Sequence, residues 1–197
     1  MKKIFIVLFC LVFCTACAKQ EITNYPPKAG PIVAFGDSIT YGYDVKAKEA
    51  YPALLEEMWQ REVINLGISG DTSLTALKRL DELKPLEPSF VLIELGGNDF
   101  LKKVPHAQTQ KALEDIVDYV HSLGAVAVLI DTGGHGPMNT YTKINKKITK
   151  EKKTLFVKGI MNGIFTNRNL KVDAIHPNKE GHKIIADRID KALKPYL

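Results

Sequence analysis

The sequence predicts an α/β domain: a three-layer α/β/α sandwich around a flavodoxin-like, five-stranded parallel sheet. Short apolar runs alternate with stretches of helical periodicity, which is typical of a parallel sheet covered by helices on both faces. The chain has 197 residues, of which 45% are hydrophobic and 25% are charged. That length and composition suit one soluble globular domain, and they argue against disordered, collagen-like and multi-span membrane proteins.

Five apolar runs are the expected strands, and they cover residues 32–35, 63–66, 90–95, 125–130 and 154–157. Helical spacing predicts helices over residues 51–61, 72–83, 107–123, 139–152 and 178–193. In a sheet of this kind the ligand site lies beyond the carboxyl ends of the strands. Reactive residues are therefore expected directly after strands.

The first 16 residues have the pattern of a signal peptide. Lys2 and Lys3 make a basic start, residues 4–13 are an unbroken apolar run, and small residues follow. The run is too short to cross a membrane, which takes about 20 apolar residues. A buried N-terminal strand or helix is the alternative, but the basic start and the small-residue exit favour export.

All three cysteines lie in this segment, at Cys10, Cys14 and Cys17. Cys17 follows Thr15 and Ala16 and resembles the cysteine of a bacterial lipobox, although Cys14 stands where that motif usually has leucine. The resemblance implies a lipid anchor on Cys17, an exported lipoprotein of the bacterial cell envelope and a mature chain without disulfides. A simple signal peptide with a stray cysteine is the alternative.

The segment after Cys17 is polar, carries Pro26, Pro27 and Gly30, and has no apolar period. We interpret residues 17–30 as a tether between a lipid anchor and the domain. The folded domain is then expected to span residues 31–197.

Ser38 follows the first expected strand, in the run Gly36-Asp37-Ser38. Glycine and a short polar residue allow a sharp turn that would present the serine at the mouth of the sheet. Serine becomes a good nucleophile when a base takes its proton. Taken alone, the motif favours an ordinary turn in which serine or aspartate caps a helix.

Asp173 and His176 are three residues apart in the loop before the last helix. A carboxylate at this spacing can accept from one imidazole nitrogen and leave the other free to act as a base. Pro177 then ends the loop and starts the helix. A helix-start motif with a surface histidine is the alternative.

Gly70 follows the second expected strand, and Asn98 follows the third after two glycines. The Gly70 N–H group and the Asn98 side chain could point at a developing oxyanion. Each motif alone is also compatible with a simple turn.

The four motifs together, on four loops at one end of one sheet, resemble the SGNH hydrolases, also called the GDSL esterase and lipase family. The marker residues are Ser38, Gly70, Asn98 and His176, with Asp173. The stretches 65–72 and 93–99 look most like the branch of bacterial thioesterases, lysophospholipases and arylesterases. Two features depart from that branch, which often has glycine at the position of Ala174 and a different sequence over residues 131–137.

The resemblance implies a serine ester hydrolase that needs no cofactor and no metal. Ser38 would be the nucleophile, His176 the base and Asp173 its orienting carboxylate. The N–H groups of Ser38 and Gly70 and the Asn98 side chain would form the oxyanion hole. The implied partners are small-molecule esters, thioesters or lipids, together with the membrane through Cys17.

Two other functions remain open at this point. The first is a carbohydrate acetyl esterase that uses the same residues on an acetyl group. The second is a binding lipoprotein that kept the fold and lost the activity; such proteins usually lack one of the marker residues, and here Ser38, Asn98 and His176 are all present.

The remaining charged residues and histidines predict no further site. The net charge is only +5 and the basic residues are dispersed, so no nucleic-acid partner is expected, and the lysines of residues 146–153 are interpreted as a solvated face. The spacing of the other histidines fits no metal site. We expect His121 and His182 at the surface, and His135, in a glycine-rich loop, near the mouth of the site.

Overall fold

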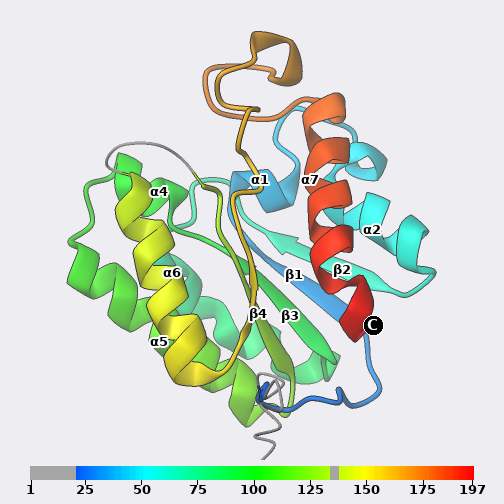
Figure 1. The fold of residues 1–197 in the computed structure, drawn as a ribbon, viewed down its shortest axis with the longest axis vertical. Coiled ribbons are helices and arrows are strands. Elements are labelled where there is room, and N and C mark those ends of the chain that lie inside the picture. Colours follow the sequence, from blue (N-terminus) through cyan, green and yellow to red (C-terminus); the bar gives the residue numbers. More distant parts are fainter. Residues whose placement is uncertain (1–20, 134–137) are drawn as a thin grey trace, which may run out of the picture.

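The computed structural model describes residues 21–133 and 138–197, and it is a three-layer sandwich (Figure 1). The sheet consists of β1 (Ile32–Gly36), β2 (Val63–Gly67), β3 (Phe90–Glu94), β4 (Val126–Ile130) and β5 (Leu155–Val157). Its strand order is β2-β1-β3-β4-β5, and every neighbouring pair is parallel. The predicted α/β fold with a five-stranded parallel sheet is confirmed.

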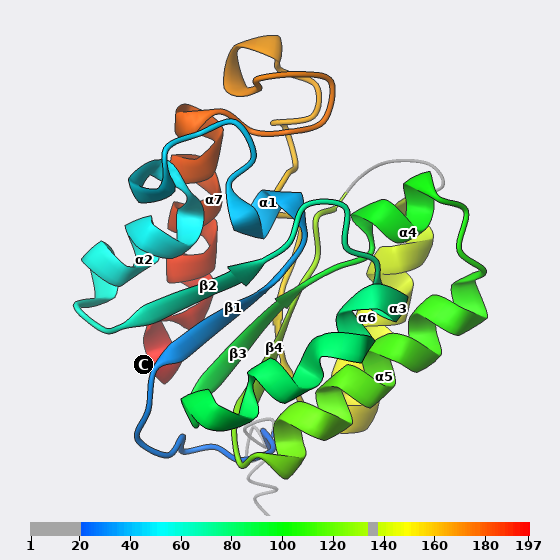
Figure 2. The ribbon, with the colours of Figure 1, turned by 180° about the vertical axis from the view of Figure 1, so that it is seen from behind.

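Helices cover both faces of this sheet (Figures 1 and 2). One face carries α2 (Tyr51–Trp59) and α7 (Lys179–Leu193). The other carries α3 (Ser73–Ala76), α5 (His106–Ser122) and α6 (Asn139–Lys152). Two short helices, α1 (Ser38–Tyr41) and α4 (Gly97–Leu101), begin just beyond the carboxyl ends of β1 and β3. Both of these short helices carry motif residues.

Side chains of the central strands alternate between two hydrophobic clusters. In β1, Ile32 and Ala34 pack with α2 and α7, whereas Val33 and Phe35 pack with α3 and α5. All residues of β1, β3 and β4 are buried, which explains why these strands have continuous apolar runs. Burying one such aliphatic side chain contributes about 1.5–3 kcal/mol, so the two clusters hold the strand ends in fixed positions.

The helix predicted over residues 72–83 is wrong in its length. Only α3 is α-helical, and residues 77–82 continue as a 3₁₀ helix with a break at Arg79, whose φ and ψ are −119° and 20°. Arg79 Nε donates to Asp71 at 2.7 Å, and Arg79 Nη2 donates to the carbonyl of Gly36 at 3.2 Å. These bonds hold the guanidinium against the end of β1 at the point where the helix breaks.

Residues 21–30 of the predicted tether lie against the domain. The N–H of Thr23 donates to the carbonyl of Lys153 at 3.0 Å, and Asn24 Nδ2 donates to the carbonyls of His121 and Ala125 at 2.9 and 3.0 Å. These partners lie at the ends of α5 and α6, next to the amino ends of β4 and β5. The described chain therefore begins at the edge of the sheet opposite to the carboxyl ends of the strands (Figure 1).

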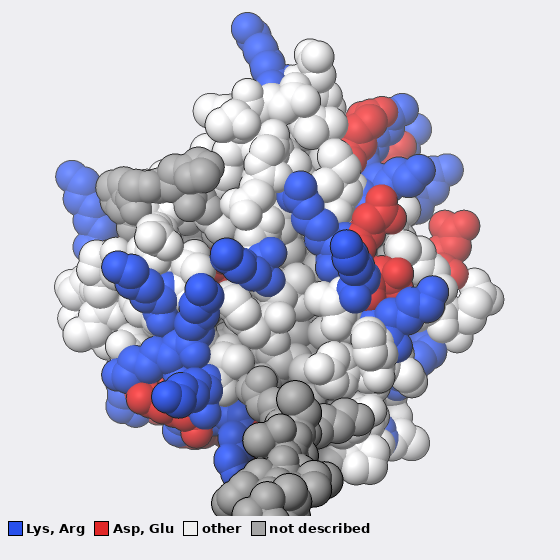
Figure 3. Space-filling model, in the orientation of Figure 1, with Lys and Arg blue, Asp and Glu red and all other residues white. Residues whose placement is uncertain are grey.

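The exposed face of α6 is rich in lysine, and basic side chains gather over it at the left of Figure 3. Its exposed lysines are Lys143, Lys146, Lys147 and Lys150. This arrangement agrees with the solvated face expected from the sequence. In the described residues, no helix is long and apolar enough to span a membrane.

The expectation that His182 lies at the surface is wrong. Its side chain is fully buried, its Nδ1 accepts the N–H of Tyr51 at 3.2 Å, and the two rings stack. His182 precedes Ile185 and Ile189 by three and seven residues, so it belongs to the apolar face of α7. His121 is partly buried, with its Nε2 atom out of contact with solvent.

Burial lowers the pKa of His182 to about 4. A group whose pKa is depressed on folding stabilises the fold above its unfolded pKa of about 6.5, and this contribution is lost as the pH falls toward 4. The loss amounts to about 3 kcal/mol at most.

We therefore expect His182→Asn to weaken the dependence of stability on pH between 7 and 4. Asparagine offers an oxygen near the position of Nδ1 for the N–H of Tyr51, but it does not titrate. The measurement is the denaturant midpoint at several pH values, with the exposed His106→Asn as the control. Parallel curves for the wild type and His182→Asn would contradict this account.

Candidate active site

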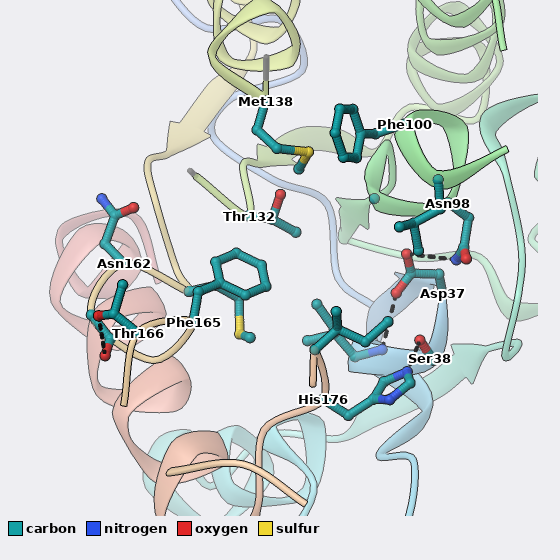
Figure 4. Close-up of a pocket in the computed structure, with 16 residues that line it drawn as sticks. Asp37, Ser38, Asn98, Phe100, Thr132, Met138, Asn162, Phe165, Thr166 and His176 are labelled. Carbon is teal, nitrogen blue, oxygen red and sulfur yellow. Dashed lines mark hydrogen bonds between the residues drawn. The ribbon is translucent and has the colours of Figure 1, made fainter. Parts of the chain in front are cut away.

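Four segments meet at the carboxyl edge of the sheet. Ser38 opens α1 after β1, Gly70 lies in the loop after β2, and Asn98 lies in α4 after β3. Asp173 and His176 come from the loop that precedes α7. Figure 4 shows Asp37, Ser38, Asn98 and His176 side by side at one wall of a cavity. The structure thus brings Ser38, Asn98, Asp173 and His176 together, whereas Gly70 is not among the residues that line the cavity.

The turn that presents Ser38 depends on its two preceding residues. Asp37 Oδ1 accepts the N–H of Ile39 at 3.0 Å and caps α1. Gly36 has no room for a side chain, because a Cβ there would lie 2.2 Å from Thr40 Oγ1 and 2.6 Å from the carbonyl oxygen of Glu94. The backbone can therefore turn sharply out of β1 and leave Ser38 8% exposed at the cavity wall.

Ser38, His176 and Asp173 form one hydrogen-bonded chain. Ser38 Oγ lies 3.0 Å from His176 Nε2, and His176 Nδ1 lies 2.7 Å from Asp173 Oδ2. Asp173 Oδ1 also accepts the N–H groups of Ile175 and His176, each at 2.8 Å. One carboxylate thereby shapes the loop and holds the imidazole ring.

The environment of Asp173 keeps it ionised. Burial acts to raise its pKa, but the N–H and ring hydrogen bonds of His176 and the N–H of Ile175 outweigh it and lower the pKa to about 2. The ring of Tyr43 packs against the ring of His176, and the two ring centroids are 4.3 Å apart. A charged carboxylate at Nδ1 favours the tautomer in which Nε2 is free to accept a proton.

Ala174, where the related branch often has glycine, fits this loop. Its φ angle is not positive, and its carbonyl accepts from Lys171 Nζ at 2.8 Å. The methyl group therefore causes no backbone strain at this position.

Asn98 and Gly70 are each held by a neighbouring group. Asn98 Nδ2 donates to Asp37 Oδ2 at 3.1 Å. Gly70 has a φ of 84°, and its carbonyl accepts from Lys102 Nζ at 2.7 Å, which ties the loop after β2 to α4. Lys102 played no part in the sequence interpretation, because an exposed lysine four residues after Asn98 carries no distinctive signal.

Glu94 is a further polar residue of the site that the sequence analysis missed. It is the last residue of β3 and is fully buried. Its Oε2 accepts from Thr40 Oγ1 at 3.0 Å. The sequence did contain a signal for Glu94, because it is the only charged residue in the otherwise apolar run 90–95. A buried strand tolerates a carboxyl group only where that group has polar partners.

The cavity beside Ser38 has a volume of about 340 Å³ and a mostly apolar lining. Phe100, Met138, Phe165 and Thr132 also line it, and Phe100 comes from the same helix as Asn98 (Figure 4). The remaining apolar lining comes from Ile39, Leu101, Met161 and Ile175. A site of this size and chemistry suits a small ligand with an apolar part. His135, expected near the mouth, lies outside the described residues.

Large apolar side chains are also exposed around the mouth. Leu101 and Ile175 line the cavity and are exposed, and the exposed Tyr43 packs on the ring of His176. In the described part of the chain, no group of three or more histidine, cysteine, aspartate or glutamate residues could hold a metal ion.

Comparisons with known proteins agree with this geometry. The chain is 35% identical over 178 residues to "Thioesterase 1/protease 1/lysophospholipase L1" of Escherichia coli (strain K12), with 86% of each chain covered. The crystal structure of TesA superimposes with a TM-score of 0.81 at 28% identity and covers 85% of this chain and 99% of that one.

A second solved structure is the psychrotrophic esterase EstA from Pseudoalteromonas sp., inhibited by monoethylphosphonate. It has a TM-score of 0.77 at 29% identity and covers 85% of this chain and 98% of that chain. Residues 34–184 match the GDSL-like Lipase/Acylhydrolase family, so the chain belongs to this family of ester hydrolases.

Proposed function

We propose that the chain hydrolyses esters or thioesters of apolar acyl chains through an acyl-enzyme on Ser38. The observation that carries the proposal is the chain of hydrogen bonds from Ser38 through His176 to Asp173 at the wall of an apolar cavity. A serine beside an oriented base is the arrangement that nucleophilic acyl transfer requires.

In the first half-reaction, Ser38 Oγ attacks the carbonyl carbon while His176 Nε2 takes the hydroxyl proton. The negative oxygen of the tetrahedral intermediate is stabilised by the N–H groups of Ser38 and Gly70 and by Asn98 Nδ2. One such donor contributes about 3–4 kcal/mol. His176 then gives its proton to the departing alcohol or thiol, and Ser38 keeps the acyl group.

In the second half-reaction, water replaces the alcohol or thiol. His176 takes a proton from the water as its oxygen attacks the acyl carbon, and it returns the proton to Ser38 Oγ as the acid leaves. Asp173 stays ionised in both halves and stabilises the imidazolium.

The cavity supports acyl chains longer than acetyl. Each methylene of the acyl chain that the apolar lining removes from water contributes about 0.8 kcal/mol to binding. This corresponds to an increase of about fourfold in kcat/KM per methylene. Leu101 and Ile175 line the cavity and are also exposed, so the apolar surface continues to the outside. A carbohydrate acetyl esterase would instead favour a shallow polar cleft, so acetylated sugars are the competing outcome of the substrate test.

The test of this proposal is a series of nitrophenyl esters from acetyl to palmitoyl, beside acetylated xylan and a lysophospholipid. We expect kcat/KM to rise with chain length up to the capacity of the cavity. Ser38→Ala is expected to fold normally, to lose hydrolysis and to escape labelling by a fluorophosphonate. A folded Ser38→Ala protein with substantial turnover would contradict the mechanism.

Leu101→Glu tests the cavity itself in the same series, because Leu101 lines the cavity and is 53% exposed. It is expected to lower kcat/KM for octanoyl esters more than for acetyl esters. Met58→Glu, at an exposed position on α2, is the matched control and is expected to leave kcat/KM unchanged for both esters. Equal losses on both esters would place the acyl chain elsewhere.

We expect Asp173→Asn to be less damaging than His176→Ala. His176 moves the proton in both half-reactions, whereas the asparagine oxygen can still accept the loop N–H groups. In a Ser-His-Asp triad, such losses are on the order of 10⁴-fold for the carboxylate and 10⁶-fold for the histidine.

The measurement is kcat/KM on a nitrophenyl ester, with the exposed Asp187→Asn as the control. If His176→Ala kept a near-wild-type rate, the base would be another residue.

For localisation we propose a cell-envelope lipoprotein anchored on Cys17, on the basis of the lipobox-like sequence. From Cys17 to Glu21 the chain can reach at most about 14 Å. Because the described chain begins at the amino edge of the sheet, the mouth of the cavity would face away from the anchoring membrane. Substrates would then arrive from the aqueous side.

Cys17→Ser is expected to move the protein from the membrane fraction to the soluble fraction, while Cys10→Ser leaves it in the membrane fraction. The measurement is fractionation with acyl-chain labelling. A Cys17→Ser protein that stays membrane-bound would contradict the anchor.

A further inference from the structure

Two buried carboxyl groups, Asp37 and Glu94, lie at the carboxyl ends of the neighbouring strands β1 and β3. Glu94 is fully buried, and no lysine or arginine of the described residues forms an ion pair with it. Its Oε2 accepts from Thr40 Oγ1, which also lies 2.9 Å from Tyr51 OH. No N–H or O–H group of the described residues donates to its other oxygen, Oε1, which is also buried.

Asp37 is the neighbour of Glu94. Its side chain is buried, its Oδ1 accepts the N–H of Ile39, and its Oδ2 accepts from Asn98 Nδ2. Asp37 directly follows Gly36, which pairs with Glu94 across β1 and β3, and a hydrogen bond between the two side-chain carboxyl groups contributes to the pKa shift of each. Two carboxyl groups in such contact hold one proton between them, because two buried like charges repel strongly.

The proton resides on Glu94 at neutral pH. Burial raises the pKa of Asp37 to about 6, while burial and the charge of Asp37 raise the pKa of Glu94 well above its usual value. The groups that face the pair are Thr40 from α1, Tyr51 from α2, Asn98 from α4, and His176, whose charge lowers the pKa of Asp37. Asp37 is therefore the anion of the pair.

The charge on Asp37 decides which end of the Asn98 amide faces it. A carboxylate only accepts hydrogen bonds, so it selects the amide nitrogen, and the second N–H of that nitrogen stays available. A protonated carboxyl group could donate to the amide oxygen instead and let the amide turn over. The orientation of Asn98 thus depends on the shared proton residing on Glu94 and not on Asp37.

We propose that Asp37 and Glu94 are positioning residues of the oxyanion hole: Glu94 holds the shared proton, and the Asp37 carboxylate then keeps the Asn98 nitrogen aimed at the substrate oxygen. This inference rests on the oxyanion role of Asn98 in the proposed function. The two residues would affect kcat through the orientation of Asn98.

Asp37→Asn is the first test, because its oxygen can still cap α1 at Ile39. Its NH₂ group then faces Asn98 and requires that amide to present its oxygen. We expect kcat to fall by about 10²-fold, as for loss of one oxyanion donor, with KM changed less than about threefold. Asp115→Asn, an exposed carboxylate paired with Lys111, is the control and is expected to leave kcat unchanged.

Combination with Asn98→Ala distinguishes positioning from a structural effect. Asn98→Ala alone is expected to lower kcat by about 10²–10³-fold, and adding Asp37→Asn is expected to lower it less than about twofold further. If Asn98→Ala leaves kcat intact, the oxyanion role of Asn98 fails. If Asn98→Ala lowers kcat but Asp37→Asn costs as much in that background as in the wild type, the positioning proposal fails.

Glu94 is tested by a pair of variants of similar size. Glu94→Gln keeps a donor toward Asp37, whereas Glu94→Met cannot donate. We expect the Gln variant to retain at least about tenfold more kcat than the Met variant, with both folded by thermal melting. Equal kcat values in the two folded variants would overturn the role of Glu94.

Discussion

The arrangement of the site depends on the two hydrogen bonds that the Asp37 carboxylate accepts. One of its oxygens caps the short helix that presents Ser38, and the other holds the Asn98 amide. These partners follow β1 and β3, which are neighbours in the sheet, with Gly36 paired with Glu94. A single buried group therefore relates Ser38 to the Asn98 amide, and the absence of a side chain at Gly36 lets the two strand ends come this close.

Burial of the Asp37 carboxyl group lowers the stability of the fold, and the size of this effect depends on pH. Because burial raises the pKa of Asp37 to about 6, its contribution to stability is present at low pH and is lost as the pH rises through that value. His182 acts in the opposite direction, since its lowered pKa removes stability as the pH falls. The carboxyl pair and the buried imidazole thus oppose each other across the mildly acidic range.

Much of the fold and of the site could be predicted because the determining signals are local. A strand that is buried on both faces has a continuous apolar run, and a motif placed after it must lie at the carboxyl edge of the sheet. Ser38 and Asn98 were found in this way, whereas Asp173 and His176 were found from their spacing in the loop before the last helix. The five strands differ from their predicted bounds by only a residue or so at either end.

The features that were missed depend on contacts between distant segments. The break at Arg79 follows its bonds to Asp71 and to the carbonyl of Gly36, which no helical periodicity records. His182 was placed at the surface because polarity was weighed above its position on the apolar face of α7. The partnership of Glu94 with Asp37 requires knowing that β1 and β3 are adjacent, and strand order is a property of the whole sheet.

The parallel sheet also separates the candidate active site from the start of the described chain. Because all five strands run in one direction, every strand contributes its carboxyl end to one edge and its amino end to the other. The first edge holds Ser38 and the cavity, whereas the second receives residues 21–30 through Thr23 and Asn24. The bonds that fix the start of the described chain share no residue with those that orient Ser38, His176 and Asn98. Whatever precedes residue 21 can therefore differ in length or attachment while the geometry of the catalytic edge stays the same.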